Sequence, residues 1–578
     1  MPGFFVSNCN ADFDLHERME DRFIRQKANT PTEDITMLSL TLNKFLDDKL
    51  FVNNDAYIVI LEGYLLNKAD LLKQYKQSSL YDLVVTLYQE KGEVFPEVFR
   101  GCFSGVLLDK QKNSWQVFTN QIGDNPVFYY FDGAVFAAAS QVKYLIDFCK
   151  SCGRLLTFNE SCAYQLLTFG YVATNETYAN EIGRLGGGEY LVFKNGEARI
   201  KKYHRFEKHP DRFARSTESE MIDAIDAAFR NAVRLEWGKD AEYGYKHLSD
   251  LSGGLDSRMN YWVAHEMCPC RSLVLTYSKA GYLDETIAEA IAQKWNDELI
   301  FKALDDISFL YDIDENVEML GGLSLYAAIT GGKRLLETLN LDGYGIEHTG
   351  QVGDAALGSF FKSPNDGIHK QPKGMYSQRL EARLSETVNN WDQNYDDYEV
   401  YLMYVRGFHG ACNSHLIRRN YTEVGSPFLN VEFLQLCFDI PVKYRIGHNI
   451  YRKWILKKYP GAAEFRWEKT GTKLTEGKAV AFIGRAIKRG PNKIKSKLGL
   501  YRNIRSGMNP LGYWLRNNVD VREYMNGYEQ NGYRWLPVGV SEQLVNDLKM
   551  LYATGSAYEK TMVLTVLAAA KLYFGEGQ

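Results

Sequence analysis

The chain has 578 residues, of which 45% are hydrophobic and 24% are charged, and its net charge is −4. These values fit about two or three packed globular domains and do not indicate a nucleic-acid-binding protein. No apolar run approaches the roughly 20 residues of a membrane span, and the N-terminus lacks the basic and apolar regions of a secretory signal. We therefore expect a cytoplasmic protein with no transmembrane segment.

Residues 1–205 carry short apolar or β-branched runs that are separated by turn residues. This pattern predicts strands at 56–61, 103–108, 115–119, 127–131 and 134–138. Helical apolar spacing predicts one helix over 80–90. Together these elements indicate an α+β sandwich of stacked antiparallel sheets with helices.

The charged stretch from Lys201 to Glu220 is the best linker candidate. After it, the apolar patterns predict helices at 218–236, 259–267 and 283–295. They also predict a strand that leads into Ser252, and strands at 271–277 and 298–303. This alternation indicates an α/β fold with a doubly wound parallel sheet, followed from about Asp397 by a helical C-terminal region. We therefore expect domains at 1–205 and 215–578.

Nine cysteines are scattered along the chain, and an odd number cannot all pair internally. Reduced thiols are the simplest interpretation. Cys149 and Cys152 have the spacing of half a zinc site. No second pair with this spacing and no clustered histidine follows, so incidental cysteines are favoured.

The segment from His247 to Ser257 joins a predicted strand to a predicted helix. Its loop reads Ser252-Gly253-Gly254-Leu255-Asp256-Ser257. Adjacent glycines let backbone N–H groups approach phosphate oxygens, and a helix N-terminus adds positive potential. Because phosphate would repel Asp256, this residue suggests a bridging Mg²⁺. The alternative is a plain glycine-rich turn, but the complete string between a strand and a helix favours phosphate binding.

This string resembles the pyrophosphate loop of the asparagine synthetase family, whose members are ATP-pyrophosphatases. Further along the chain, 349–358 resembles the family's second acidic-glycine motif, which usually reads SGEGADELFGG. Residues 425–430 resemble its VPFLD segment, and 451–456 resemble the helix that follows. Lys469 stands where the family carries its catalytic lysine. The resemblance implies an ATP-pyrophosphatase type of fold for the second domain.

The family chemistry has two steps: a carboxylate attacks the α-phosphorus of ATP, and an amine then attacks the acyl-adenylate. The resemblance implies that Asp256 and Asp354 hold Mg²⁺ and that Lys469 stabilises the developing negative charge. It also implies that ATP and pyrophosphate are bound by Leu251, Ser252, Gly253, Gly254, Leu255, Asp256, Ser257, Thr276 and Gly350. Taken alone, Asp354 could equally be a capping residue and Lys469 a surface lysine.

Gln351 is the main departure from the family pattern, which has glutamate there, and Ala355 replaces a second glutamate. Glutamine can orient a substrate but cannot take a proton, so we place Gln351 in the catalytic centre as an orienting residue. His348 is a nearby candidate base, although a packed histidine is the simpler interpretation. Arg258 is either a helix-surface residue or a contact for an anionic substrate.

The first domain resembles a class II glutamine amidotransferase domain of the Ntn-hydrolase-like type. Residues 99–105 are similar to the family's LRGMFAF, and 123–130 are similar to its LGIKPLYY. The usual N-terminal cysteine nucleophile is replaced by Pro2, Cys9 is too far along the chain to share the terminal amine, and Glu62-Gly63 stands in place of Asn-Gly. We therefore expect no glutaminase activity.

In these features the chain resembles the branch of the family that has lost glutaminase activity, which includes β-lactam synthetases and lasso-peptide cyclases. We expect an ATP-dependent ligase that joins the carboxylate and the amine of a small-molecule or peptide substrate, in the biosynthesis of a peptide natural product, another specialised metabolite or a polysaccharide. The alternatives are an ammonia-dependent asparagine synthetase, which Gln351 and Ala355 disfavour, and a catalytically degenerate binding subunit.

The segment from Arg485 to Arg505 carries eight basic residues and no acidic one. A solvated basic surface is the simpler interpretation, and a contact for an anionic partner is the sharper hypothesis. A homodimer is a further hypothesis. No nucleic-acid partner is expected.

Overall fold

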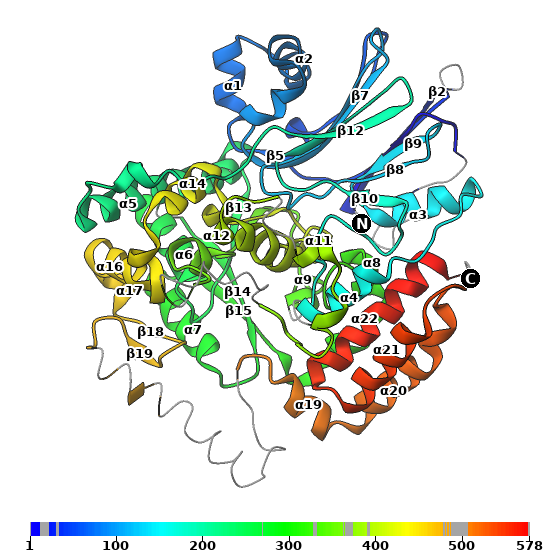
Figure 1. Ribbon diagram of the computed structural model, residues 1–578. Coiled ribbons are helices and arrows are strands. Elements are labelled where there is room, and N and C mark those ends of the chain that lie inside the picture. The colour runs from blue at the N-terminus through cyan, green and yellow to red at the C-terminus, as the bar shows by residue number, and fades with distance from the viewer. Residues whose placement is uncertain are drawn as a thin grey trace.

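Figure 1 shows the computed structural model of the chain, with two antiparallel sheets, a parallel sheet and a helical C-terminal part. The structure describes residues 2–575 except 12–14, 16–21, 31–33, 269, 328–331, 362, 364–373, 390–393, 478–479, 481–482, 485 and 487–506.

The first part of the chain forms two six-stranded antiparallel sheets. One sheet has the order β10(Ile182–Arg184), β8(Phe128–Phe131), β9(Phe136–Ala139), β1(Gly3–Ser7), β3(Ile35–Leu42) and β2(Phe23–Thr30). The other has the order β12(Glu197–Lys202), β11(Glu189–Lys194), β7(Ser114–Thr119), β6(Gly101–Asp109), β5(Tyr57–Leu65) and β4(Leu50–Asn53). The five predicted strands are present. The other seven strands of the two sheets, β1–β4 and β10–β12, were not predicted. The edge strand β2, for example, alternates weakly, with exposed Gln26 and Lys27.

The two sheets face each other across an apolar layer that includes Phe4, Ile60 and Val117. Helices α1(Lys68–Tyr75) and α2(Leu80–Lys91) cover the outer face of the second sheet. Helices α3(Val142–Ser151) and α4(Glu160–Phe169) cover the first, together with helices from the C-terminal end of the chain. The resulting helix–sheet–sheet–helix layering confirms the expected Ntn-hydrolase-like α+β sandwich.

The chain then enters the long helix α5(Glu218–Tyr243), which begins with a capping box between Thr217 and Glu220. The apolar pattern predicted this helix only to Glu236. It continues for two more turns because Trp237, Lys239 and Asp240 are also buried, and it ends where Gly244 adopts a left-handed conformation.

A five-stranded parallel sheet follows, with the order β15(Glu298–Ala303), β14(Ser272–Ser278), β13(Lys246–Asp250), β16(Tyr344–His348) and β17(Val424–Gly425). One face is covered by α5, α6(Asp256–Met267) and α7(Leu283–Trp295), and the other by α8(Ile313–Leu320), α9(Lys333–Leu336) and α13(Ser414–Arg418). This confirms the predicted doubly wound sheet. Because strand order reverses between β13 and β16, the carboxyl ends of these two strands form a switch point, where such sheets bind ligands.

The rest of the chain is mainly helical, as predicted. Its elements are α10(Gly353–Leu357), α11(Glu386–Asn389), α12(Tyr398–Leu402), a π-helix over Met403–Gly410, α14(Val431–Asp439), α15(Val442–Arg445), α16(Asn449–Lys458), α17(Pro460–Ala463), the hairpin β18(Arg466–Trp467) and β19(Thr472–Lys473), α19(Leu511–Asn517), α20(Val519–Gly532), α21(Glu542–Thr554) and α22(Ala557–Phe574). Helix α22 lies against α4 and α8, so the C-terminal end of the chain packs on the first sheet layer (Figure 1).

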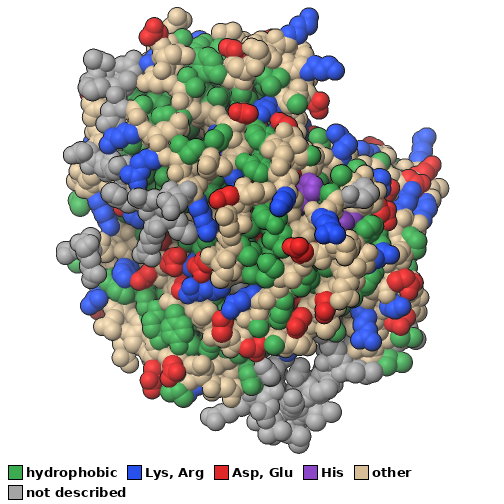
Figure 2. Space-filling view, turned by 180° about the vertical axis from the view of Figure 1, so that it is seen from behind, with side chains coloured by type: hydrophobic (Ala, Val, Ile, Leu, Met, Phe, Trp, Pro, Cys, Tyr) green, Lys and Arg blue, Asp and Glu red, His purple; other side chains and the backbone are tan. Residues whose placement is uncertain are grey.

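On the face shown in Figure 2, Lys and Arg side chains are interspersed with Asp and Glu side chains. All nine cysteines are free thiols, and Cys149 is buried in an apolar cluster. Within the described ranges, every helix is too short or too polar to cross a membrane.

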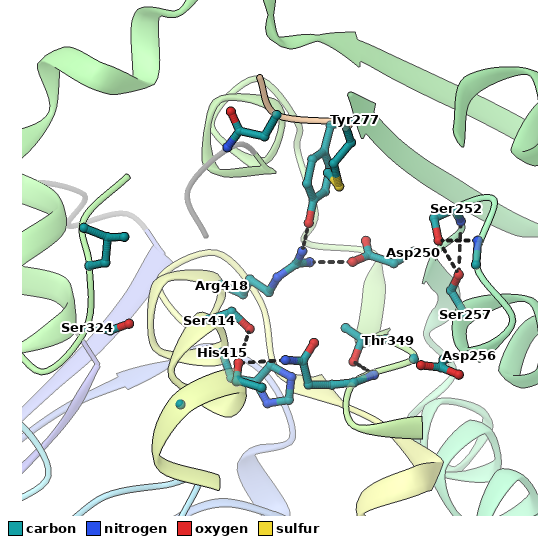
Figure 3. A pocket seen from close by; sticks show the side chains of 18 of the residues that line it. Asp250, Ser252, Asp256, Ser257, Tyr277, Ser324, Thr349, Ser414, His415 and Arg418 are labelled. Atoms are coloured by element: carbon teal, nitrogen blue, oxygen red, sulfur yellow. Dashed lines mark hydrogen bonds and ion pairs between the residues drawn. The ribbon is translucent and has the colours of Figure 1, made fainter. Parts of the chain in front are cut away.

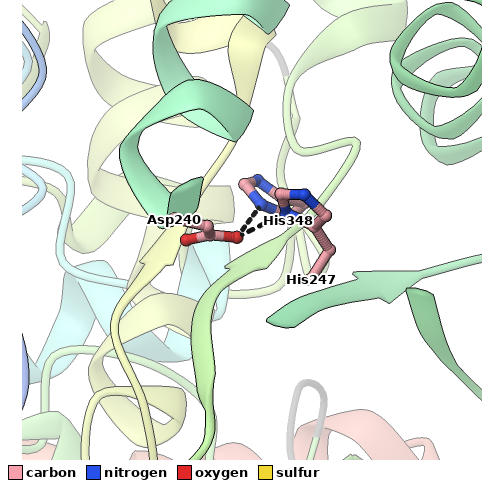
Figure 4. A group of neighbouring side chains, drawn as sticks. All are labelled: Asp240, His247 and His348. Atoms are coloured by element: carbon pink, nitrogen blue, oxygen red, sulfur yellow. Dashed lines mark hydrogen bonds and ion pairs between the residues drawn. The ribbon is translucent and has the colours of Figure 1, made fainter. Parts of the chain in front are cut away.

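Helix α5 is tied to the parallel sheet by a buried cluster of charged side chains (Figure 4). His348, at the end of β16, lies 2.9 Å from Glu236 and 2.8 Å from Asp240. Asp240 also lies 2.9 Å from His247 of β13. Burial alone would lower the pKa of His348, but the charges of Asp240 and Glu236 outweigh this effect and raise it to about 9. The packed interpretation of His348 is therefore confirmed.

A pH-dependent stability is expected from His348. Its pKa is about 9 in the folded protein and near 6.5 when unfolded, so its contribution is complete below about pH 6.5 and is lost as the pH rises through 9. At pH 7, the free energy of unfolding of His348→Gln should be about 2–3 kcal/mol lower than that of the wild type. Urea unfolding measures this difference. This gap should close by pH 10. A gap that is constant between pH 7 and pH 10 would show that His348 is not charged in the folded protein.

Candidate functional site

A cavity of about 860 Å³ opens at the carboxyl ends of β13, β14 and β16. In Figure 3, Ser252 and Ser257 lie on one side of the cavity and Ser324 lies on the other. Eight of the predicted site residues line it, namely Leu251, Ser252, Gly254, Asp256, Ser257, Thr276, Gly350 and Gln351. The other four, Gly253, Leu255, Asp354 and Lys469, are not among the lining residues.

The loop after β13 is held in shape by hydrogen bonds of its own. Ser257 Oγ accepts from the Ser252 N–H at 3.1 Å and lies 3.0 Å from Ser252 Oγ. The Gly254 N–H donates to Ser252 Oγ at 3.2 Å, and the Gly253 N–H donates to Asp284 Oδ1 at 2.7 Å. The two serines thus order the loop backbone, and Asp284 is a contact that the sequence did not indicate.

A second loop, after β16, packs directly against the first. A Cβ at Gly350 would lie 2.2 Å from the Ser257 nitrogen, and a Cβ at Gly353 would lie 2.7 Å from Asp256 Cγ. Both glycines are therefore required by the close approach of the two loops. This approach brings together Asp256 and Asp354, which are 98 positions apart in the sequence.

The Asp256 carboxylate accepts a hydrogen bond from the Asp354 N–H at 2.8 Å and another from the Tyr451 hydroxyl at 2.9 Å. Burial and the neighbouring Asp354 carboxylate raise the pKa of Asp256 well above its usual range. Two carboxylates from separate loops, each raising the cost of the other's charge, suit a divalent cation with oxygen ligands. The residues present therefore fit Mg²⁺.

Lys469 lies in the turn of the hairpin formed by β18 and β19, and its side chain is exposed. The Glu468 N–H donates to the Gly253 carbonyl at 2.9 Å, which fastens this hairpin to the loop from Ser252 to Ser257. Lys469 Nζ lies 5.5 Å from the centre of the Trp467 ring, and its positive charge acts to lower the pKa of Asp256. Lys469 thus lies at the edge of the site rather than in the cavity wall.

Arg258 has a structural role. Its buried guanidinium donates to the carbonyls of Gly253, Ala462 and Phe465, each at 3.2 Å. These bonds connect the loop from Ser252 to Ser257 to the segment that leads into the hairpin. The hypothesis of a contact with an anionic substrate is therefore wrong for this residue, because the cation is already surrounded by carbonyl groups.

Gln351 lines the cavity, and its side-chain amide donates to the Ala411 carbonyl at 2.7 Å. The Ser426 hydroxyl donates to the Gln351 backbone carbonyl at 3.0 Å. The first bond holds the Gln351 side chain at the cavity wall, and the second holds its backbone. His348 is absent from the cavity lining among the residues that the structure describes.

A buried ion-pair network at the base of the cavity was not predicted from the sequence (Figure 3). Arg418 of α13 pairs with Asp250 at 2.9 Å and with Glu347, and it donates to the Tyr277 hydroxyl at 2.6 Å. Asp250 lies two residues before Ser252, the first residue of the loop, and Glu347 directly precedes His348. Arg418 therefore connects the ends of β13, β14 and β16. Its position 71 residues after Glu347 left no local signal of this role.

A second, much smaller cavity of about 20 Å³ lies between the two parts of the chain, lined by Pro2, Gly3, Glu62 and Gly63 on one side and by Leu416, Arg419 and Glu423 on the other. Glu62 accepts from Thr41 at 2.5 Å and pairs with Lys49 at 3.3 Å. Lys49 also pairs with Glu423 at 3.0 Å. Three charged side chains, Glu62, Arg419 and Glu423, therefore line this cavity, and each is paired with a residue outside the lining.

Between the two cavities lies a chain of buried polar groups. Arg419 lines the small cavity and pairs with Asp124 at 2.9 Å. Asp124 lies 3.6 Å from His415, which lines the large cavity. Although burial opposes it, the charge of Arg419 and the His415 contact lower the pKa of Asp124 to about 2. The predicted anion contact at 485–505 lies outside the described residues.

Comparisons with known proteins find one matching domain family and several similar proteins. A family model described as a glutamine amidotransferase domain matches residues 46–204. The chain is 22% identical over 250 residues to a *Methanocaldococcus jannaschii* protein provisionally named glutamine-hydrolyzing asparagine synthetase 2, a match that covers 42% of this chain and 47% of that protein. A second such protein of that organism, numbered 1, is 23% identical over 415 residues, 68% of this chain and 67% of the relative.

Glutamine-hydrolyzing asparagine synthetase 1 of *Lotus japonicus* is 33% identical over 222 residues, which cover 37% of this chain and 31% of the plant protein. The chain thus spans about half of the first *Methanocaldococcus* relative and about a third of the plant relative.

Removal of the Arg418 cation should be strongly destabilising. In Arg418→Met, Asp250 and the buried Glu347 carboxylate lose their counter-charge, so the free energy of unfolding should fall by about 3–5 kcal/mol. Urea unfolding followed by tryptophan fluorescence measures this loss. The double variant Glu347→Gln/Arg418→Met should recover part of it. A loss below about 1 kcal/mol would contradict a buried network.

Proposed function

Because the chain belongs to the asparagine synthetase family, we propose that it is an ATP-dependent ligase that adenylates a carboxylate, releases pyrophosphate and joins the acyl group to an amine. The observation that carries this proposal is the meeting of Asp256 and Asp354 beside the serine–glycine loop at the switch point of the parallel sheet. Ligand-binding crevices of such sheets lie at this position.

In the first step, the adenylation of the carboxylate, each group of residues has a separate role. The loop from Ser252 to Ser257 holds the phosphates with hydroxyl and backbone N–H groups at the start of α6. Asp256 and Asp354 would hold Mg²⁺, which neutralises phosphate charge when bound. Lys469, whose charge already reaches Asp256, stabilises negative charge that develops on the α-phosphate and on the tetrahedral intermediate.

The second step needs an amine that is free to attack. Gln351 cannot accept a proton, and its side chain is held by the Ala411 carbonyl. We infer that it orients the acyl group or the amine. The amine then arrives unprotonated or loses its proton to another group.

The first part of the chain does not supply ammonia in this proposal. Glu62, which lines the small cavity beside Pro2, is paired with Lys49, and no cysteine is among the described lining residues. The route toward the large cavity contains Arg419, Asp124 and His415. We therefore propose that the amine belongs to the substrate, which favours a role in the biosynthesis of a specialised metabolite, a peptide natural product or a polysaccharide.

Pyrophosphate exchange tests the ligase proposal. With Mg-ATP and pools of candidate acids, the protein should exchange labelled pyrophosphate into ATP only when an accepted acid is present. Aspartate as the one accepted acid would favour an asparagine synthetase, and a larger acid favours the proposed ligase. Lys469→Met should reduce the exchange rate by about 10²–10³-fold, since it removes a cation that acts on the transition state.

Lys473→Met is the matched control, because Lys473 lies on the same hairpin and pairs with exposed Glu464 at 3.0 Å. It should keep the wild-type rate. An unchanged rate in Lys469→Met would refute the role of Lys469. Absence of both ATP binding and exchange with any acid would refute the ligase itself.

Incubation with glutamine should release no glutamate above the buffer level. Pro2 offers no nucleophile. Cys9 Sγ lies 3.1 Å from Ser7 Oγ, and burial raises the pKa of its thiol, which disfavours the reactive thiolate. An enzymatic glutamate assay checks this, with Cys9→Ser as the control. Glutamate release that Cys9→Ser abolishes would overturn the prediction.

A further inference from the structure

The large cavity extends well beyond the phosphate loop. Its far end is lined by Tyr171, which follows α4, by Tyr376, by Arg406 and Gly410 of the π-helix, and by Tyr558 of α22. At about 860 Å³, the cavity is near the upper end of the range of roughly 300–1,000 Å³ for ligand sites. It therefore has room for a second ligand beside a nucleotide. The π-helix also indicates a binding site at this end of the cavity. Such segments are rare in proteins, and those that occur are frequently found at functional sites.

Arg406 is a half-buried cation whose flat faces are covered. Its guanidinium carbon lies 4.7 Å from the centre of the Phe360 ring. A Cβ at Gly374, which has a φ of +99°, would lie 2.4 Å from Arg406 Nε. Among the described residues, no carboxylate pairs with this guanidinium, although the side chain lines the cavity. A held guanidinium without a counter-charge is suited to an anionic ligand.

Tyr171 supplies a second, independent observation. Its side chain is 7% exposed, and its hydroxyl is buried without a hydrogen-bond partner. Its ring packs against the π-helix, where a Cβ at Gly410 would lie 3.1 Å from it. Burial raises the pKa of Tyr171, and the charge of Arg406 opposes this rise. The phenol therefore remains a protonated donor, and a buried donor without a partner is costly unless a ligand accepts its bond.

We propose that Arg406 and Tyr171 form a subsite for a second carboxylate of the acid substrate, at the opposite end from the carboxylate that is adenylated. This inference rests on the proposed function and specifies its substrate class: an elongated acid with two carboxylates. The guanidinium balances a single negative charge and the hydroxyl donates one further hydrogen bond, which fits a carboxylate better than a phosphate. The rings of Tyr376 and Tyr558, 5.6 Å apart, offer apolar contact to the middle of such a molecule.

Pyrophosphate exchange with paired acids tests the subsite. The probes are aromatic and aliphatic dicarboxylic acids of increasing length and the monomethyl ester of each, which differs only in the second charge. The wild type should show a KM at least 10-fold lower for the accepted diacid than for its monoester. Arg406→Met should raise the KM for the diacid by about 10–100-fold, and Tyr171→Phe by about 3–10-fold. Neither should change the KM for the monoester by more than about 2-fold.

The matched control is Arg234→Gln, because Arg234 is an exposed arginine of α5 that is bonded to Asn231 at 2.9 Å. It should behave as the wild type. ATP binding, measured separately by calorimetry, should stay within about 2-fold in all variants, which shows that they are folded. Equal KM values for diacids and monoesters, or an Arg406→Met variant with an unchanged diacid KM, would overturn the subsite while the ligase function stands. ATP binding without exchange for any of these acids would overturn the subsite alone, whereas absence of both ATP binding and exchange with any acid would overturn the ligase as well.

Discussion

Repulsion between two carboxylates is the constraint on which the site depends. Asp256 and Asp354 come from loops that leave neighbouring parallel strands, and the Asp354 N–H is bonded to the Asp256 carboxylate. A protein gains nothing in stability from placing two acids together, since each raises the cost of charging the other. The arrangement persists because glycines let the loops touch, and because Tyr451 and the Asp354 backbone satisfy the buried oxygens.

The surrounding structure holds these loops rigidly. Arg418 joins the strand ends that carry Asp250 and Glu347, while His348 and Asp240 fasten the long helix α5 to the same two strands. Arg258 and Glu468 attach the hairpin that carries Lys469 to the phosphate loop. Buried charges of this kind contribute little net stability, but removal of one partner is costly, so they favour a single arrangement of the site.

The first part of the chain contributes directly to the wall of the large cavity. Its helix α4 leads into Tyr171, which forms part of the far wall of the large cavity. Helix α22, from the other end of the chain, packs against α4 and contributes Tyr558. The inferred substrate subsite is therefore assembled by three distant segments, and the amidotransferase-like sheets support its wall.

The sequence by itself determined the features that depend on local pattern. Alternating apolar runs identified five strands of the sandwich, and strand–helix alternation identified the parallel sheet. The loop from Ser252 to Ser257 and the glycines at 350 and 353 were recognisable because close backbone approach restricts residue type.

Tertiary structure alone decided which distant side chains meet. Examples are the pairing of Arg418 with Asp250, the packing of Arg406 on Phe360, and the Tyr171 hydroxyl that has no hydrogen-bond partner. No sequence motif indicates these features, because the residues involved are far apart in the sequence. The same reason explains Arg258 and His348: their chemistry permitted a role at the site, and only packing showed that backbone carbonyls and buried carboxylates already hold them.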